Sequence, residues 1–376
     1  MPSLPEVRII INIAIATTAF LTDKQWQQYY IMDGSSSSNS SFEALENLVV
    51  YSPAELQMLG LKLVNYTTKR IRKAKAKRNN TRFKGHYGAV PSVLCKIWED
   101  LQTTTIELAR VQRHDLHIES FLMAMHHLKR YPTDLEREAI FDIDEMQGRN
   151  RVWFYVEKIR QLKWEKIVWP ADNFGNSLWA ITVDGVHFWI EEPQHPDWSQ
   201  DREYFSHKYG HAGLCYELGI SIAESKLVWM NGKFKAGRSD NLIFKKEGLM
   251  AKLIASGKRA IGDSGYPGHP EVISTPNNHD SPKVKKFKSR ALKRHEKFNG
   301  MIKTFDCLKG RFRHSVERFE QCMEAVCVVC QYKMDMGDRL YDVLIESSTG
   351  TMRGSRFESY RHTMKITTLT HTIKLC

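Results

Sequence analysis

The sequence predicts a mixed α/β fold preceded by a helical region. Apolar residues recur at helical spacing through residues 91–165, short apolar runs typical of strands follow residue 170, and helical periodicity returns after residue 263. Strands followed by helices are typical of a sheet flanked by helices. A chain of 376 residues exceeds a typical single domain, so we expect more than one folded region.

The composition indicates a globular protein with an anionic partner. Hydrophobic residues make up 42% of the chain and aromatic residues 11%, which is enough to build a core and excludes a disordered protein. The net charge of +12 favours nucleic acid as the partner, with an acidic membrane surface second. A basic protein without an anionic partner is the alternative.

The cysteines argue against a disulfide-stabilised protein, and the N-terminus argues against a membrane-spanning one. The seven cysteines are an odd, scattered set, which indicates reduced thiols rather than a disulfide framework. Cys327 and Cys330 have metal-ligand spacing, but no second pair accompanies them and their Val-rich surroundings favour a buried helix. The apolar run 9–21 is too short to span a bilayer, so we expect no membrane partner.

The first third of the chain contains a linker and a basic run. Residues 1–50 are uninformative and include a Ser-rich stretch, 34–41, that predicts a linker. Residues 69–84 hold nine basic residues in sixteen and no acid, which predicts phosphate contacts and is compatible with nuclear import; a merely solvated face is the alternative. The candidate DNA contacts here are Lys69, Arg70, Arg72, Lys73, Lys75, Lys77 and Arg78.

Residues 51–170 as a whole predict the basic arm followed by a helical, helix-turn-helix-like region. Pro91 begins an amphipathic helix, and two later helices flank a turn at residues 142–144. In a helix-turn-helix the second helix enters the major groove, and it would present Gln147, Arg149, Asn150 and Arg151 to base edges. The alternative is a small helical bundle that only supports the following domain.

Residues 171–345 are predicted to form the α/β domain, and residues 346–376 show no clear pattern. The segment 177–183 predicts a first strand, 213–223 and 226–230 a hairpin, and 259–262 a fourth short strand. Asp184 and Asp263 follow the first and fourth of these strands. A carboxylate at a strand end is exposed to a ligand, and Gly185 and Gly265 free the backbone to turn there.

A third acid, Glu296, lies on a predicted helix with Ser289 as a candidate N-cap. The apolar stripe of this helix leaves Glu296 just beside the core, from which it is expected to point toward the strand ends. The neighbouring Lys293, Arg294 and Lys297 are expected to grip a DNA backbone.

Three gathered carboxylates fit metal-dependent phosphodiester cleavage. Two divalent ions about 4 Å apart need several anionic oxygens, and hard oxygen ligands select Mg or Mn. The alternative is that each acid is a turn or surface residue.

These motifs resemble the PIF/Harbinger group of eukaryotic DDE transposases and their domesticated relatives. The similarity covers roughly residues 85–332 and rests on VDGVH (183–187), GDSGYP (262–267) and RHEKFNGMIKTFDCLKGRFRH (294–314), with GRSDN (237–241) as a further feature. Separations of 79 and 33 residues between the three acids suit that group.

The resemblance implies an RNase H-like fold with a mixed five-stranded sheet, in which adjacent first and fourth strands bring Asp184 beside Asp263 and a helix delivers Glu296. It implies that all three ligate two divalent ions for cutting double-stranded DNA and joining element ends to a target. His187, Asp240 and Ser264 match neighbouring motif positions and are expected at most to orient ligands or substrate.

We also expect a nuclear protein, in line with the basic run, with a second copy of the chain as a candidate partner. Transposases of this group commonly depend on a Myb-like DNA-binding partner, and no Myb-like repeat is visible in this sequence. A domesticated or degenerate DNA-binding protein without transposition activity is the alternative function. A hydrolase that acts on another acidic substrate is the third.

Overall fold

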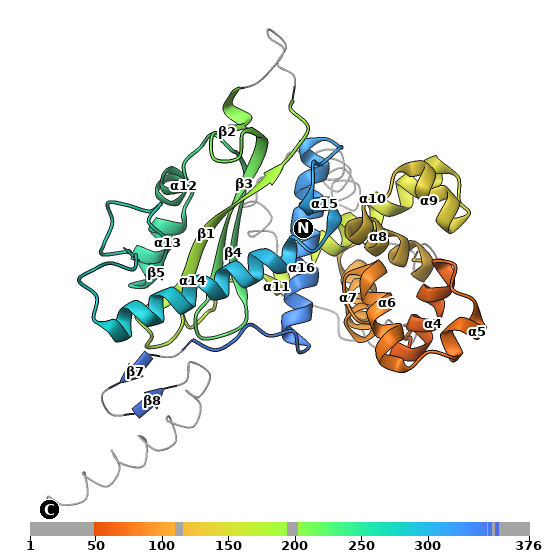
Figure 1. The fold of residues 1–376 in the computed structure, drawn as a ribbon, viewed down its shortest axis with the longest axis horizontal. Coiled ribbons are helices and arrows are strands. Elements are labelled where there is room, and N and C mark those ends of the chain that lie inside the picture. The colour runs from red at the N-terminus through yellow and green to blue at the C-terminus, as the bar shows by residue number, and fades with distance from the viewer. Residues whose placement is uncertain (1–48, 110–115, 194–201, 344, 348–349, 353–376) are drawn as a thin grey trace, which may run out of the picture. The chain divides into compact units, whose positions relative to one another are not determined.

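A computed structural model describes residues 49–109, 116–193, 202–343, 345–347 and 350–352 (Figure 1). The predicted N-terminal segment, apart from its last two residues, and most of the tail lie outside these residues, as does Cys376. The described residues belong to one compact unit that begins at Val49. No helix in these ranges combines the length and the apolar character that crossing a membrane requires.

The chain begins with a run of helices, as the sequence predicts. Ser52 caps the first helix through a capping box with Glu55, and Thr133 and Glu136 form the same arrangement at α9. The helices of this region are α4 (Pro53–Leu63), α5 (Thr68–Arg72), α6 (Ala76–Tyr87), α7 (Pro91–Ala109), α8 (Ile118–Arg130), α9 (Asp134–Phe141), α10 (Glu145–Gln161) and α11 (Lys163–Lys166).

A mixed sheet follows, with helices on both faces. Its order is β4–β3–β1–β5–β6, with β2 beside β3; β1 pairs with β3 antiparallel and with β5 parallel. Within the described residues the sheet has six strands rather than the five expected. Two of them, β2 and β6, are only two residues long, which is too short for a pattern of apolar residues to predict. The strands are β1 (Trp179–Trp189), β2 (Phe205–Ser206), β3 (His211–Ser221), β4 (Leu227–Lys235), β5 (Arg259–Ile261) and β6 (Ile273–Ser274).

Helices between and after the strands complete the fold. α12 (Asp240–Lys246) and α13 (Leu249–Ser256) pack on one face of the sheet, where Phe244, Leu249 and Leu253 meet Ile181 and Val183 of β1. The helices after the sheet are α14 (Pro282–Ile302), α15 (Asp306–Lys309) and α16 (Val316–Asp335), and a hairpin of β7 (Ile345–Ser347) and β8 (Gly350–Met352) follows.

The main hydrophobic core lies on the other face of the sheet and continues into the helical region. Val186 and Phe188 of β1 join it from the sheet, and Phe298 of α14 joins it from the later helices. Figure 1 shows α14 lying across the sheet, and residues of α8 and α10 belong to the same core. Burial of this continuous apolar surface joins the helical region to the sheet.

Two details of these elements differ from the sequence-based expectation. α14 begins at Pro282, with Ser281 rather than Ser289 as the N-cap, because the Ser281 hydroxyl accepts a hydrogen bond from Val284 N. β1 does not end before Asp184 but continues to Trp189, because nine residues of β1 pair with β3.

A buried charge cluster ties the helical region to α16. Glu324 of α16 is 6% exposed and accepts hydrogen bonds from Lys163 of α11 at 2.9 and 3.0 Å and from Arg160 of α10. Each charged side chain of the cluster neutralises another that would otherwise be buried without a counter-charge. Removing one of these side chains is therefore expected to lower the stability of the protein more than replacing the whole cluster by apolar residues.

We therefore expect Glu324→Ala to lower the free energy of unfolding by about 3 kcal/mol or more, because it leaves Lys163 buried and unpaired. Denaturant-induced unfolding measures the change. Glu317→Ala on the same helix is the control, since its side chain is 73% exposed, and it should change stability by less than about 0.5 kcal/mol. Equal effects of the two substitutions would contradict the assigned role of the cluster.

Candidate functional site

The candidate site lies around Asp184, just beyond the point where the parallel pairing of β1 with β5 ends. The pairing of β1 with β5 ends at Thr182 and Ile261, whereas the pairing with β3 continues past Asp184. Asp184 is thus in the interior of a strand and not at its end, which corrects the sequence-based placement. On its other side β1 has no strand partner at Asp184, because β5 ends at Ile261.

Asp263 follows β5 at the same level of the sheet. Continuing the parallel register by two residues places Asp263 beside Asp184, and the two carboxylates are close enough for Asp263 to raise the pKa of Asp184. Asp263 is exposed, and its Oδ1 accepts a hydrogen bond from Gly265 N at 2.8 Å, which forms a tight turn. The structure therefore brings together the first two predicted acids.

The environment of Asp184 disfavours its ionised form. Burial, followed by the charges of Asp263 and Asp240, raises the pKa of Asp184 from 3.8 to about 6. Lys208 and a hydrogen bond from Asn299 act in the opposite direction. Carboxylates held together against their mutual repulsion are the arrangement that a bound divalent cation would stabilise.

Side chains of α14 contact Asp184 on the face of the sheet that α14 covers. Asn299 Nδ2 donates a hydrogen bond to Asp184 Oδ2 at 2.9 Å, while Asn299 Oδ1 is buried without a hydrogen-bond partner among the described residues. The ammonium group of Lys303, on the next turn, is close enough for Asp184 to affect its pKa. The sequence-based site did not include Asn299, although its position three residues after Glu296 places the two on neighbouring turns of one helix.

The structure does not bring Glu296 into this group. Glu296 is exposed on α14, and no hydrogen bond or ion pair of its carboxylate occurs within the described part of the chain. It lies about one turn before Asn299 on α14, and its charge acts on Tyr341 rather than on Asp184.

Asp240 and His187 lie on the opposite face of β1. Asp240 is the first residue of α12, and its carboxylate rests on Gly185, where a Cβ atom would collide with Asp240 Oδ1. His187 Nε2 is 3.8 Å from Asp240 Oδ1. Both residues therefore lie behind Asp184, on the other face of the strand. Ser264, the third residue expected in a supporting role, is exposed in the turn after Asp263.

Arg294 is not available to DNA, in contrast to the sequence-based expectation. It is 2% exposed and donates hydrogen bonds to the backbone oxygens of Tyr341, Ser221 and Glu224. These bonds fix the segment after α16 against the end of β3, so Arg294 has a structural role. Its neighbours Lys293 and Lys297 are exposed, as phosphate contacts must be.

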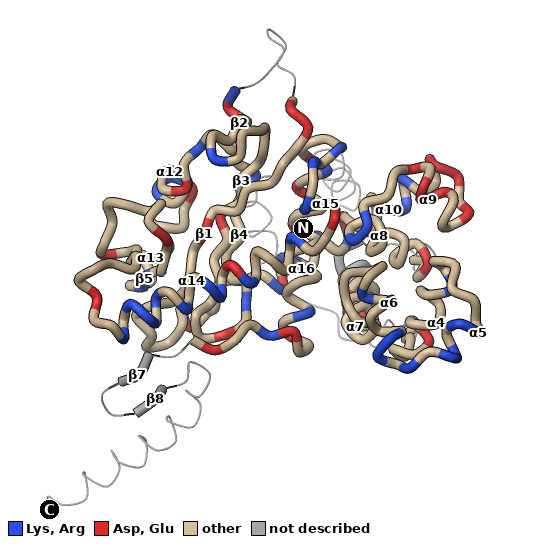
Figure 2. Tube along the Cα trace, in the orientation of Figure 1, with Lys and Arg blue, Asp and Glu red and all other residues tan. Residues whose placement is uncertain are grey.

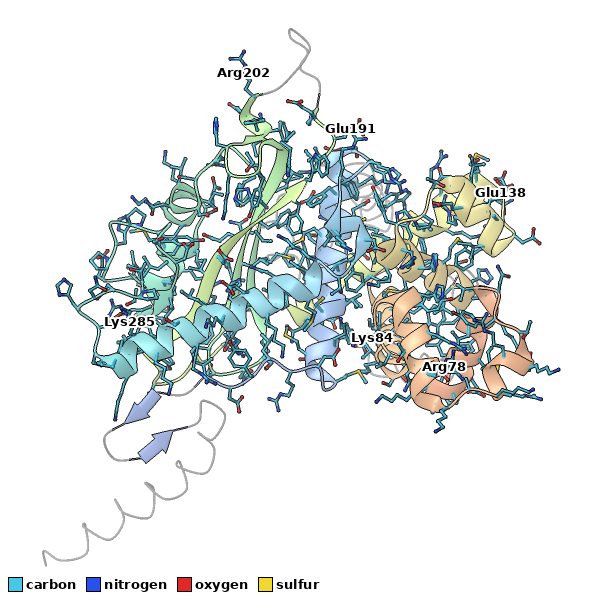
Figure 3. The ribbon with its side chains drawn as sticks, viewed as in Figure 1. Arg78, Lys84, Glu138, Glu191, Arg202 and Lys285 are labelled. Carbon is cyan, nitrogen blue, oxygen red and sulfur yellow. The ribbon has the colours of Figure 1, made fainter. Side chains whose placement is uncertain are left out.

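The basic residues of α5 and α6 form an exposed group. Figure 2 shows lysine and arginine gathered along these helices, and Figure 3 shows Arg78 extending outward from them. None of the seven predicted contacts forms an ion pair with another described residue. This group, which we call the basic segment, consists of Lys69, Arg70, Arg72, Lys73, Lys75, Lys77 and Arg78, and all seven are exposed.

The predicted base-reading residues of α10, unlike those of the basic segment, lie close to acidic residues. α9 and α10 are joined by a short turn, and Arg149 and Arg151 are exposed on α10. Arg149 is engaged by Asp134 of α9 through hydrogen bonds of 2.6 and 3.0 Å, and Figure 2 shows acidic residues gathered at α9. Binding of a phosphate by Arg149 would therefore compete with an existing ion pair.

Substitution of Asp184 tests the electrostatics of this site. The raised pKa of Asp184 means that ionisation opposes folding, and this penalty is absent below the ordinary pKa of 3.8 and complete above about 6. We therefore expect Asp184→Asn to raise the free energy of unfolding by about 1–3 kcal/mol at pH 7.5 without divalent ions. The gain should vanish near pH 4, where the folded wild-type protein carries a protonated Asp184.

Urea unfolding in a chelating buffer at both pH values measures this difference. Asp172→Asn is the control, because Asp172 is exposed and this substitution removes a carboxylate charge that is not buried. A gain that is equal at both pH values, or a loss of stability at pH 7.5, would contradict the interpretation.

Comparison with known proteins agrees with this geometry. Residues 183–331 match the family model described as DDE superfamily endonuclease. No curated protein and no solved structure was found to match the chain. The matched segment contains Asp184, Asp263 and Glu296, together with most of the mixed sheet and the helices α12 to α15. Residues 183–331 are thus similar to DDE superfamily endonucleases, which suggests a nuclease or transposase function.

Proposed function

We propose that this protein is a metal-dependent DNA endonuclease of the transposase type. The observation that carries the proposal is the juxtaposition of Asp184 and Asp263 within the segment that matches the DDE endonuclease family. Two neighbouring carboxylates, one half-buried and one exposed, favour binding of a hard divalent ion. The family match implies DNA as the substrate.

The donor atoms fit a site for Mg or Mn. Asp184 and Asp263 provide carboxylate oxygens, and the unpartnered Asn299 Oδ1 is a further oxygen donor beside them. Two ions bound here would activate the attacking oxygen and stabilise the leaving oxygen of the phosphodiester. We assign Asp184, Asp263 and Glu296 as the ligands, with Glu296 moving by a side-chain rotation from its exposed position.

The other side chains of the site would position DNA. Lys208 and Lys303 both lie close enough to Asp184 to interact with its charge, and a scissile phosphate beside the acids would be within the field of these two ammonium groups. Lys293 and Lys297 project from α14 and can contact the flanking backbone.

The motifs also support a more specific proposal. We propose an RNase H-like fold of the Harbinger type and an enzyme that joins element ends to target DNA in the nucleus. We propose that it acts as a homo-oligomer with a Myb-like accessory protein. The parallel β1–β5 pair beside an antiparallel β1–β3 pair is compatible with such a fold.

Cleavage of DNA tests the proposed activity. We expect the purified protein to nick DNA that contains the cognate ends in Mn²⁺ or Mg²⁺, and Asp263→Asn to reduce cleavage at least 10²-fold because it removes a ligand charge. Glu296→Gln should have a similar effect. Glu138→Gln, on exposed α9, is the control and should cleave like the wild type (Figure 3). Cleavage by Asp263→Asn at the wild-type rate would contradict the assignment.

The second candidate function is DNA binding without cleavage, as in a domesticated transposase. The observation that favours it is the exposed basic segment, whose seven cations form no ion pair with another residue that the structure describes and do not depend on the acids. Salt-sensitive DNA binding in a protein that shows no cleavage with either metal would support this function instead.

Both functions predict DNA binding by the basic segment. The triple substitution Lys73→Gln, Lys75→Gln and Lys77→Gln should weaken binding and reduce the slope of log K against log salt by about 2–3, because each phosphate contact contributes about 0.9. A fluorescence anisotropy titration at several salt concentrations measures the slope.

A control triple substitution separates local contacts from net charge. Lys226→Gln, Lys309→Gln and Arg311→Gln remove the same charge from exposed positions outside the basic segment. If both triple variants change the slope equally, only the net charge of the protein matters and the basic segment has no special role.

A further inference from the structure

Behind the acids, on the opposite face of β1, lies a cluster with a different set of donor atoms. His187 of β1 and Cys215 of β3 are direct partners in the antiparallel register, so both side chains project on the same face. This face is opposite to that of Asp184, because residues three apart in a strand point in opposite directions. Asp240, at the start of α12, meets both side chains there.

The three side chains converge on one point. His187 Nε2 is 3.8 Å and Cys215 Sγ 3.7 Å from Asp240 Oδ1, and one donor atom from each residue lies within 4.8 Å of the other two. Donors of a tetrahedral zinc ion, bound at about 2.0–2.3 Å, are separated by roughly 3.3–3.8 Å. Only small side-chain movements would therefore bring all three onto one ion.

Hydrogen bonding accounts for only part of this arrangement. The Cys215 thiol donates a weak hydrogen bond to Asp240 Oδ1 at 3.7 Å, whereas the 3.8 Å between His187 Nε2 and Asp240 Oδ1 exceeds a hydrogen bond. His187 Nδ1 is buried without a hydrogen-bond partner in the described part of the chain. The same holds for Glu217 Oε1 and Tyr266 OH in the part of the chain that the structure describes.

The backbone is also arranged to admit the Asp240 carboxylate. Gly185 lies directly beneath it, and a side chain there would collide with Asp240 Oδ1. His187 and Asp240 are 9% and 26% exposed in their side chains, so the cluster can be reached from solvent.

We propose that His187, Cys215 and Asp240 form a binding site for one borderline-soft divalent ion, of which Zn²⁺ is the best match. Imidazole nitrogen, thiolate sulfur and carboxylate oxygen are all ligands of zinc, and three protein ligands leave a fourth position for water. Mg²⁺ is a poor match because it prefers oxygen donors only. The site differs from the proposed carboxylate site in donors, in ion and in its face of the sheet.

The bound ion would have a structural consequence for the neighbouring acids. It would join β1, β3 and the start of α12, and it would neutralise Asp240, which is one of the charges acting on Asp184. A zinc ion here would thus restrict the movement of β1 directly behind the proposed carboxylate site.

Cobalt substitution tests this site without a cleavage assay. The purified full chain, freed of metal by chelation, is titrated with Co²⁺ under reducing conditions while the absorption spectrum is recorded. We expect one equivalent to produce intense visible bands of tetrahedral cobalt and a thiolate-to-cobalt charge-transfer band in the near ultraviolet. One equivalent of Zn²⁺ should then remove these bands.

Variants assign the signal to the cluster. Cys215→Ser should abolish the charge-transfer band, and Asp240→Asn, at a more exposed position, should weaken cobalt affinity at least tenfold. Cys95→Ser, at another buried thiol, is the matched control and should retain the band. Asp184→Asn should also retain it, which separates this site from the proposed catalytic metals. A wild-type protein without the band, or a band that persists in folded Cys215→Ser, would overturn the proposal.

Discussion

The mutual repulsion of Asp184 and Asp263 is the constraint on which the rest of the site depends. The parallel pairing of β1 with β5 holds the two carboxylates at one level of the sheet, and burial increases the cost of ionising Asp184. Such an arrangement lowers the stability of the protein on its own. It becomes favourable when a divalent cation supplies the missing positive charge, which connects the geometry to the chemistry of the DDE endonuclease match.

The surrounding elements support this arrangement from several directions. α14 donates the Asn299 hydrogen bond to Asp184, and buried Arg294 on the same helix fixes the end of β3. The main core joins α14 and α16 to the helical region, and the cluster at Glu324 adds charged contacts at that junction. Packing far from the acids therefore determines where α14, and with it Glu296, can lie.

Periodicity and spacing predicted much of this fold because local patterns reflect burial. The helices of residues 91–165, the β3–β4 hairpin and the short β5 strand were all predictable from apolar spacing. The full length of β1 was not, because Asp184, Gly185 and His187 interrupt its apolar pattern like a turn. The pairing with β3 that extends the strand is a long-range interaction. The burial of Arg294 depends on the carbonyl group of Tyr341, 47 residues later.

The candidate site was predictable to a similar extent. The motif resemblance implied that Asp184 and Asp263 are close, although the expected strand-end position of Asp184 was wrong. The position of Glu296 depends on the rotation of α14 and on its side-chain conformation. Cys215 could not be identified from the sequence, because it lies in an apolar strand. Only the register of β3 against β1 places it beside His187.

Magnesium-dependent stabilisation of the folded protein tests the central claim most directly. The free energy of unfolding at pH 7.5 is measured against Mg²⁺ concentration for the wild type and for Asp184→Asn, with ionic strength held constant. We expect wild-type stability to rise by about 1.4 kcal/mol per bound ion for each tenfold increase in Mg²⁺ above the dissociation constant, and the variant to show a smaller rise. An equal response of the two proteins would show that Asp184 does not hold a divalent ion.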